Sequence, residues 1–89
     1  MQLYTIADIT GDSAAHAIAP AAREIIISAT GGALRVGDAS VSATRGANVA
    51  QNTSLILPPD GSDVTAKYPA GTVYVYVPSS TTASITYGV

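Results

Sequence analysis

The clearest pattern along the chain is a strict alternation of apolar and polar side chains at residues 72–77. Successive side chains of a β-strand point to opposite faces, so this run places its valines on one face and its threonine and tyrosines on the other. We expect the valines to point into a core. Tyr74 and Tyr76 are then expected on an outer surface, with their hydroxyl groups free to meet a neighbouring sheet, subunit or partner.

Two further runs predict strands and suggest how they pair. Residues 83–87 alternate in the same way, and we expect them to form a hairpin with 72–77. Residues 23–29 contain consecutive isoleucines, so both faces of that strand are apolar, which is typical of a central strand. The Gly-Gly pair at 31–32 offers the positive φ angles of a tight turn. The sequence therefore predicts a second hairpin, between 23–29 and a short strand at 34–36.

Turn-forming residues recur at short intervals along the whole chain, which is typical of an all-β sandwich or barrel. Strands are expected at 3–9, 55–57 and 64–68, with the last two joined by a turn at Asp60 and Gly61. Prolines are expected at strand ends, because proline cannot donate a backbone hydrogen bond. They stand at positions 58, 59, 69 and 78.

The run at 14–18 is compatible with two structures. Its alanines favour a helix, for which Asp12 or Ser13 is a suitable N-cap. Pro20 favours a short extended segment instead, which is what we expect. Counting this segment gives about eight short strands, and we predict an all-β chain forming a single small β-sandwich or jelly-roll-like barrel over residues 1–89.

Charged side chains are scarce in this sequence. They make up 11% of the chain, against about 25% in an ordinary domain, and serine, threonine and alanine take their place. Such a surface suits contact with another protein, because desolvating a hydroxyl group costs far less than desolvating an ion. A domain of 89 residues without cysteine also has a thin stability margin, so we expect it to form homo-oligomers.

The composition argues against several classes of function. A net charge of -2 with four scattered basic residues does not make a nucleic-acid footprint. A single histidine without cysteine cannot build a disulfide framework or a closed zinc site. No apolar run approaches a membrane span and the N-terminus has no signal-peptide pattern, so we expect no membrane partner and synthesis in a cytoplasm.

Candidate chemistry is weak at every position. His16, Asp12 and nearby serines have the residue types of a hydrolase triad, but no nucleophile-elbow sequence accompanies them. Residues 8–12 and 60–63 pair carboxylates without the spaced acids of a calcium loop, so Asx-type turns are the better interpretation. The glycines do not follow phosphate-loop spacing. We therefore predict no enzyme, no catalytic or metal-binding residue and no cofactor.

The most distinctive segment is residues 34–46, which reads Leu-Arg-Val-Gly-Asp-Ala-Ser-Val-Ser-Ala-Thr-Arg-Gly. It gathers Arg35, Asp38 and Arg45 between glycines in a chain that has few charges. Asp38 is expected to form a fixed ion pair with Arg35 or Arg45, either within one subunit or between subunits. These three residues are candidates for fixing the loop or contacting a partner, and Tyr74 and Tyr76 are candidates for contact.

The same segment resembles one found in small virion proteins of tailed bacteriophages. Those proteins often read hydrophobic-Arg-hydrophobic-Gly-Asp, then Val-Ser or Val-Thr, then Ala-Thr-Arg-Gly. The Leu-Pro-Pro sequence at 57–59, Val-Tyr-Val-Tyr at 73–76 and Ile-Thr-Tyr-Gly at 85–88 are compatible with that resemblance.

The resemblance implies a β-sandwich that decorates or cements the outside of an icosahedral head, made in the host cytoplasm. It implies a trimer or dimer seated where major capsid subunits meet, and no catalytic residue. Related proteins also serve as head fibres, neck or tail accessory parts. The alternative function is therefore a tail, neck or fibre module that binds a receptor or carbohydrate. In that case tyrosines would stack on sugar faces, the candidates being Tyr68, Tyr74, Tyr76 and Tyr87.

Overall fold

The computed structural model describes residues 2–18, 21–57, 68 and 71–89 of the chain. Within them the chain forms eight strands and no helix. The strands are β1 (Leu3–Thr10), β2 (Ala14–Ala17), β3 (Glu24–Thr30), β4 (Leu34–Gly37), β5 (Ala47–Val49), β6 (Ser54–Leu57), β7 (Tyr74–Val77) and β8 (Thr82–Gly88). The predicted all-β class with about eight strands is confirmed, and the ambiguous run after Ser13 is a strand.

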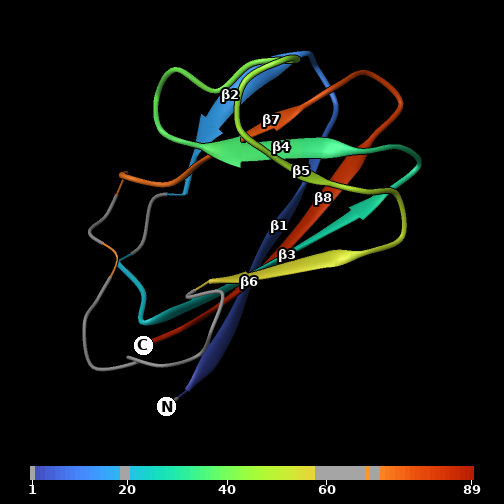
Figure 1. The fold of residues 1–89 in the computed structure, drawn as a ribbon. Coiled ribbons are helices and arrows are strands. Elements are labelled where there is room, and N and C mark those ends of the chain that lie inside the picture. Colours follow the sequence, from blue (N-terminus) through green and yellow to red (C-terminus); the bar gives the residue numbers. More distant parts are fainter. Residues whose placement is uncertain (1, 19–20, 58–67, 69–70) are drawn as a thin grey trace.

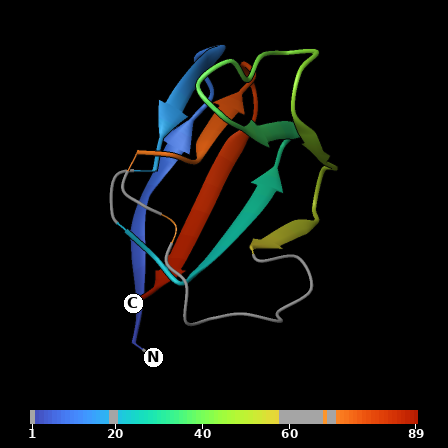
Figure 2. The ribbon, with the colours of Figure 1, turned by 60° about the vertical axis from the view of Figure 1, so that its left-hand side comes forward.

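The strands form two antiparallel sheets that face each other (Figure 1). Sheet A has the order β1-β8-β3-β6 and sheet B has the order β2-β7-β4-β5. Neither sheet closes on itself, so the architecture is a sandwich and not a closed barrel. Figure 2 shows the long strands of sheet A running past the shorter strands of sheet B toward the end where both termini lie.

Every short loop carries the chain from one sheet to the other. The loops β1–β2, β3–β4, β5–β6 and β7–β8 all cross between sheets A and B. Both predicted hairpins are therefore wrong: β3 does not pair with β4, and β7 does not pair with β8. Instead β8 lies between β1 and β3, while β7 lies between β2 and β4.

The β3–β4 loop, which contains Gly31 and Gly32, packs closely against the β7–β8 loop. Gly31 has a φ of 78°, and a Cβ atom placed on it would collide with the carbonyl oxygen of Ser80. A Cβ atom on Gly32 would collide with the hydroxyl group of Thr81. The glycines thus let the β3–β4 and β7–β8 loops approach each other, and they do not form a hairpin turn.

The core consists of the inward faces of both sheets. Ile25, Ile27 and Ile85 from sheet A are at most 1% exposed, as are Leu34 and Val75 from sheet B. This burial of aliphatic side chains between two layers is the main stabilising contribution to such a fold.

The predicted orientation of the valine run is confirmed. Val75 and Val77 are fully buried and Val73 is 8% exposed, while Tyr74 and Tyr76 on the opposite face are partly exposed. β3 is an interior strand, as the consecutive isoleucines predicted.

Some predicted features fall outside the described residues. These are the turn at Asp60 and Gly61, the strand at 64–68 apart from its last residue, and the prolines at 58, 59 and 69. Tyr68 is described, and it pairs with Ala22 in an isolated antiparallel bridge.

Candidate functional site

The outer surface of sheet B carries both predicted tyrosines. Tyr76 lies across from Ala15 on one side and Arg35 on the other, and Tyr74 lies across from Ala17 and Gly37. Three of these four neighbours are small, and both tyrosine side chains are partly exposed. We call this surface the tyrosine face, and its members are Ala15, Ala17, Arg35, Gly37, Asn48, Tyr74 and Tyr76.

The loop between β4 and β5 is held by its own polar groups. Asp38 Oδ1 accepts hydrogen bonds from the backbone N–H of Ser40 at 2.9 Å and from the hydroxyl group of Ser40 at 2.6 Å. Arg35 Nη1 donates to the carbonyl oxygen of Gly46 at 3.0 Å, which ties the two strands that flank the loop. Gly46 has a φ of 122°, and a Cβ atom there would lie 2.9 Å from the carbonyl oxygen of Val36.

The expected ion pair of Asp38 is absent from the described part of a single chain. Ser40 binds its carboxylate. The side-chain nitrogens of Arg35 and Arg45 lie farther from the carboxylate oxygens than the 4.0 Å of an ion pair. The hydrogen bonds from Ser40 hold the pKa of Asp38 below its usual value, and the charge of Arg45 acts in the same direction with a smaller effect. Arg35 therefore holds the backbone of the loop, while Arg45 influences Asp38 from a distance.

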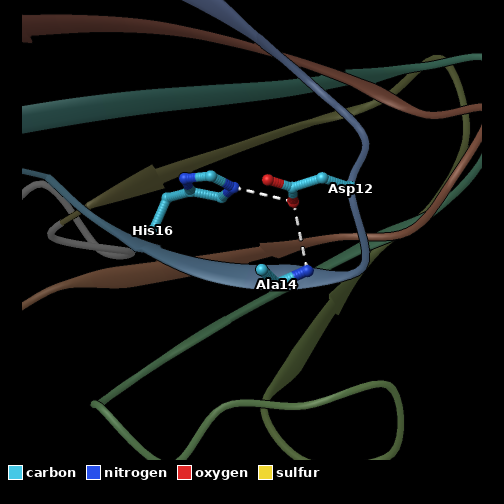
Figure 3. Close-up of polar contacts among 3 residues, drawn as sticks. All are labelled: Asp12, Ala14 and His16. Carbon is cyan, nitrogen blue, oxygen red and sulfur yellow. Dashed lines mark hydrogen bonds and ion pairs between the residues drawn. The ribbon is translucent and has the colours of Figure 1, made fainter.

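Asp12 and His16 form the one ion pair found among the described residues. Figure 3 shows the imidazole of His16 and the carboxylate of Asp12 pointing toward each other, with Nε2 and Oδ1 2.9 Å apart. The same Oδ1 accepts the backbone N–H of Ala14 at 3.1 Å, which is the Asx-type turn predicted for this segment. The hydrogen bond from His16 is the main cause that lowers the pKa of Asp12.

This pair resembles two members of a hydrolase triad, but its described surroundings offer no third. The only hydrogen bond to the His16 side chain within the described residues is that of Asp12. Asp12 also lies two residues before β2 and accepts the N–H of Ala14, the first residue of that strand. Its geometry is that of a turn and strand start on an exposed edge.

The outer surface of sheet A is a feature that sequence reasoning missed. Residues in register across its strands form three adjacent rows of hydroxyl groups with two isoleucines and no charge, whereas the row beyond them on the same surface holds Leu3, Gly88 and Glu24. One row is Thr5, Thr86, Ile26 and Ile56, the next is Ser84, Ser28 and Ser54, and the third is Thr10, Thr82 and Thr30. We call these residues the hydroxyl face.

Hydrogen bonds within the hydroxyl face join side chains on neighbouring strands. Ser28 and Ser54 hydroxyl groups lie 2.7 Å apart, and those of Thr5 and Thr86 lie 3.5 Å apart. The sequence could show, through alternation, which hydroxyl-bearing residues share one face of a strand. It could not show that they form rows, because that requires the pairing of β8 with β1 and β3.

A pocket of about 330 Å³ opens between sheet A and β2 at the edge of the sandwich. Its lining is mainly aliphatic and carries no charged side chain. The residues are Thr5, Ile6, Ile9, Ala17, Ile18, Ile85 and Tyr87.

The described part of the chain holds no cluster of three or more histidine, cysteine, aspartate or glutamate side chains suited to a metal ion. It also holds no helix that is long and apolar enough to cross a membrane. No family model, curated protein or solved structure matches this chain.

Proposed function

We propose that this chain is a structural virion protein that decorates the head of a tailed bacteriophage and stabilises the shell by bridging major capsid subunits. The observation that carries the proposal is the hydroxyl face. It presents serine, threonine and isoleucine in three uncharged rows across a sheet, and Glu24 lies in the next row, at the end of the same surface. The resemblance of residues 34–46 to phage virion proteins points to the same partner.

The physical reason is the cost of removing water from a surface. Burying a charged group without a partner is expensive, whereas a hydroxyl group can exchange its water for a backbone carbonyl or amide of another protein. Ile26 and Ile56 add apolar area in the middle of the rows. A face of this kind can be covered over a large area by a neighbouring protein, and many weak contacts of that type on one particle add up.

The proposal is tested on phage particles that lack the protein. Purified wild-type protein is added back to stripped heads, and its binding and the resistance of the heads to heat and low salt are measured. We expect wild-type protein to bind and to raise that resistance. Heads that neither bind the protein nor gain resistance would contradict the proposal.

A pair of variants identifies the surface that binds. Ser84→Glu places a charge in the middle of the hydroxyl face, while Ala15→Glu places the same charge on the tyrosine face. We expect Ser84→Glu to abolish binding and Ala15→Glu to keep it, with both proteins folded by circular dichroism. The reverse result would transfer the contact to the tyrosine face.

A second candidate function, binding of a receptor or carbohydrate by a tail, neck or fibre module, is favoured by the tyrosine face. Tyr74 and Tyr76 lie two positions apart on one strand, and Arg35 lies beside Tyr76. Aromatic rings next to polar groups are able to stack on sugars while the polar groups bind the sugar hydroxyls. Glycan-array binding that disappears in Tyr74→Ala and Tyr76→Ala, with folding intact, would favour this function over capsid decoration.

A further inference from the structure

One end of sheet A is left open by sheet B. On β8 the inward residues change from fully buried Ala83 and Ile85 to partly exposed Tyr87. On β1 the inward Tyr4 is 43% exposed. The rings of Tyr4 and Tyr87 stack with centroids 5.5 Å apart and planes 26° apart. Figure 1 shows this end, with both termini, extending away from the strands of sheet B.

Large exposed apolar side chains gather at the same end. Four such residues occur in the described part of the chain, and three of them, Leu3, Tyr4 and Val89, lie where the start of β1 pairs with the end of β8. The fourth, Ile56, lies on the opposite edge strand of sheet A. Clustered exposure of this kind marks a surface that meets a partner.

Within the described residues β1 pairs on one side only, and its other edge presents backbone groups in a known pattern. Gln2 and Val89 exchange both of their backbone hydrogen bonds, at 3.4 and 3.1 Å. In an antiparallel ladder, bonded and non-bonded pairs alternate, so Tyr4 and Ile6 also bond toward β8. The N–H and C=O groups of Leu3 and Thr5 therefore point outward from the sheet.

Only the first half of β1 is suited to pairing with another strand. The register of β1 against β8 shifts between Ile6 and Ile9, which is a β-bulge, and Asp8 lies within it. Bulges and charges on an edge strand prevent pairing with other chains. The stretch from Leu3 to Ile6 has no bulge, charge or proline.

We infer that the edge of β1 at Leu3, Tyr4 and Thr5 pairs with the same edge of a second copy of this chain, antiparallel, about a twofold axis through Tyr4. Leu3 of each copy then forms a bonded pair with Thr5 of the other, which uses the two outward-facing residues of both edges. The two Asp8 carboxylates lie away from the axis, at opposite ends of the pairing.

The occupant is a second copy because the edge is complementary to itself. The outward-facing residues flank Tyr4 symmetrically, which is the arrangement that a twofold contact requires. Tyr4 faces Tyr4 of the other copy in a non-bonded pair, whose side chains lie close together. With Tyr87 stacked on each Tyr4, a row of tyrosine rings crosses the axis on the inward face of both sheets, while Leu3 lies on the opposite face.

The contact does not depend on the proposed capsid function, since it is measured on the free protein. Because the chain contains no cysteine, single cysteine variants report on it directly. Non-bonded antiparallel pairs have Cα atoms about 4.5 Å apart, which is within the range of a disulfide bond. We expect Tyr4→Cys to form a disulfide-linked dimer under mild oxidation at least about tenfold faster than Ile56→Cys, whose side chain is similarly exposed at 48%. Equal rates would overturn the inference.

Measurements on the wild-type protein and on charged variants complete the test. In sedimentation equilibrium we expect a concentration-dependent dimer for wild type and for Ile56→Glu, and a dissociation constant raised at least about tenfold for Tyr4→Glu, which brings like charges together at the axis. Hydrogen exchange on wild type alone provides a readout that needs no variant. The amides of Leu3 and Thr5 should gain protection as protein concentration rises. A wild-type protein that stays monomeric up to about 1 mM would refute the pairing, as would amides whose protection is independent of concentration.

Discussion

The assignment of the three consecutive isoleucines to opposite faces of β3 makes a sharp stability prediction. Ile27 is fully buried between the sheets, and Ile26 lies on the hydroxyl face and is partly exposed. The substitution Ile27→Ala removes buried carbon atoms at about 0.8 kcal/mol per methylene-sized group and leaves a cavity. The sum is expected to lie in the range of about 2–5 kcal/mol measured for such substitutions.

A loss of that size is large for a chain of this length. Domains are stable by about 0.05–0.15 kcal/mol per residue, so Ile27→Ala removes a major part of the free energy of unfolding. Each 1 kcal/mol shifts the melting temperature of a small domain by roughly 4–8 °C. We therefore expect Ile27→Ala to melt at least about 8 °C below wild type.

The matched control is Ile26→Ala, which removes the same atoms one position away. Because Ile26 is partly exposed, we expect it to cost about 1 kcal/mol or less. Urea unfolding followed by circular dichroism gives both values, and Ile27→Val provides a milder variant with an expected cost of about 1 kcal/mol. If Ile26→Ala costs as much as Ile27→Ala, the orientation of β3 is wrong.

Three further predictions concern the loops and turns. Gly46→Ala places a Cβ atom 2.7 Å from a Val41 methyl group at a φ of 122°, so it should lower the free energy of unfolding by at least about 2 kcal/mol. The control Gly71→Ala is also at positive φ but has open space around it, so it should cost about 1 kcal/mol. Equal costs in urea unfolding would contradict the close packing at Gly46. The pKa of Asp12 is lowered in the fold. The stabilising contribution of its carboxylate is therefore present above the ordinary pKa of 3.8 and is lost as the pH falls through the lower pKa of the folded state. The difference in unfolding free energy between wild type and Asp12→Asn should shrink as the pH falls below 3.8, and a constant difference would refute this linkage. Replacing Ser40 by alanine removes the hydroxyl donor to Asp38, so the pKa of Asp38 should rise in a carboxyl NMR titration, and an unchanged value would show that the backbone N–H alone sets it.

Strands and their faces could be predicted from the sequence because both are local properties. In β7 the alternation of valine with tyrosine indicates which face is buried. In β3 the consecutive isoleucines indicate that both faces are apolar, as in an interior strand. The turn at Asp12 was also predictable, since an aspartate side chain reaches the N–H two residues later without any help from the rest of the fold.

Strand partners could not be predicted in the same way. A short glycine-rich loop is compatible with a hairpin in one sheet and with a crossing between sheets. Here Gly31 and Gly32 are needed for contact with the distant residues Ser80 and Thr81. The hydroxyl face, the open end of sheet A and the partner of Asp38 all depend on such long-range pairing. The ion pair expected for Asp38 does not form within one chain, because Ser40 is closer in sequence and its backbone N–H and hydroxyl group bind the carboxylate. A pair between subunits stays a prediction.

The crossing of every short loop between the sheets has a consequence for how the chain folds. β4 and β5 are the only strands that are neighbours both in the described sequence order and in a sheet. Most pairings join distant segments, and β1 pairs with β8 alone, at the other end of the strand order. Loop closure must therefore precede most of the stabilising contacts, and we expect folding in milliseconds to seconds. During synthesis β1 emerges long before its partner, so its edge is unpaired until translation reaches β8.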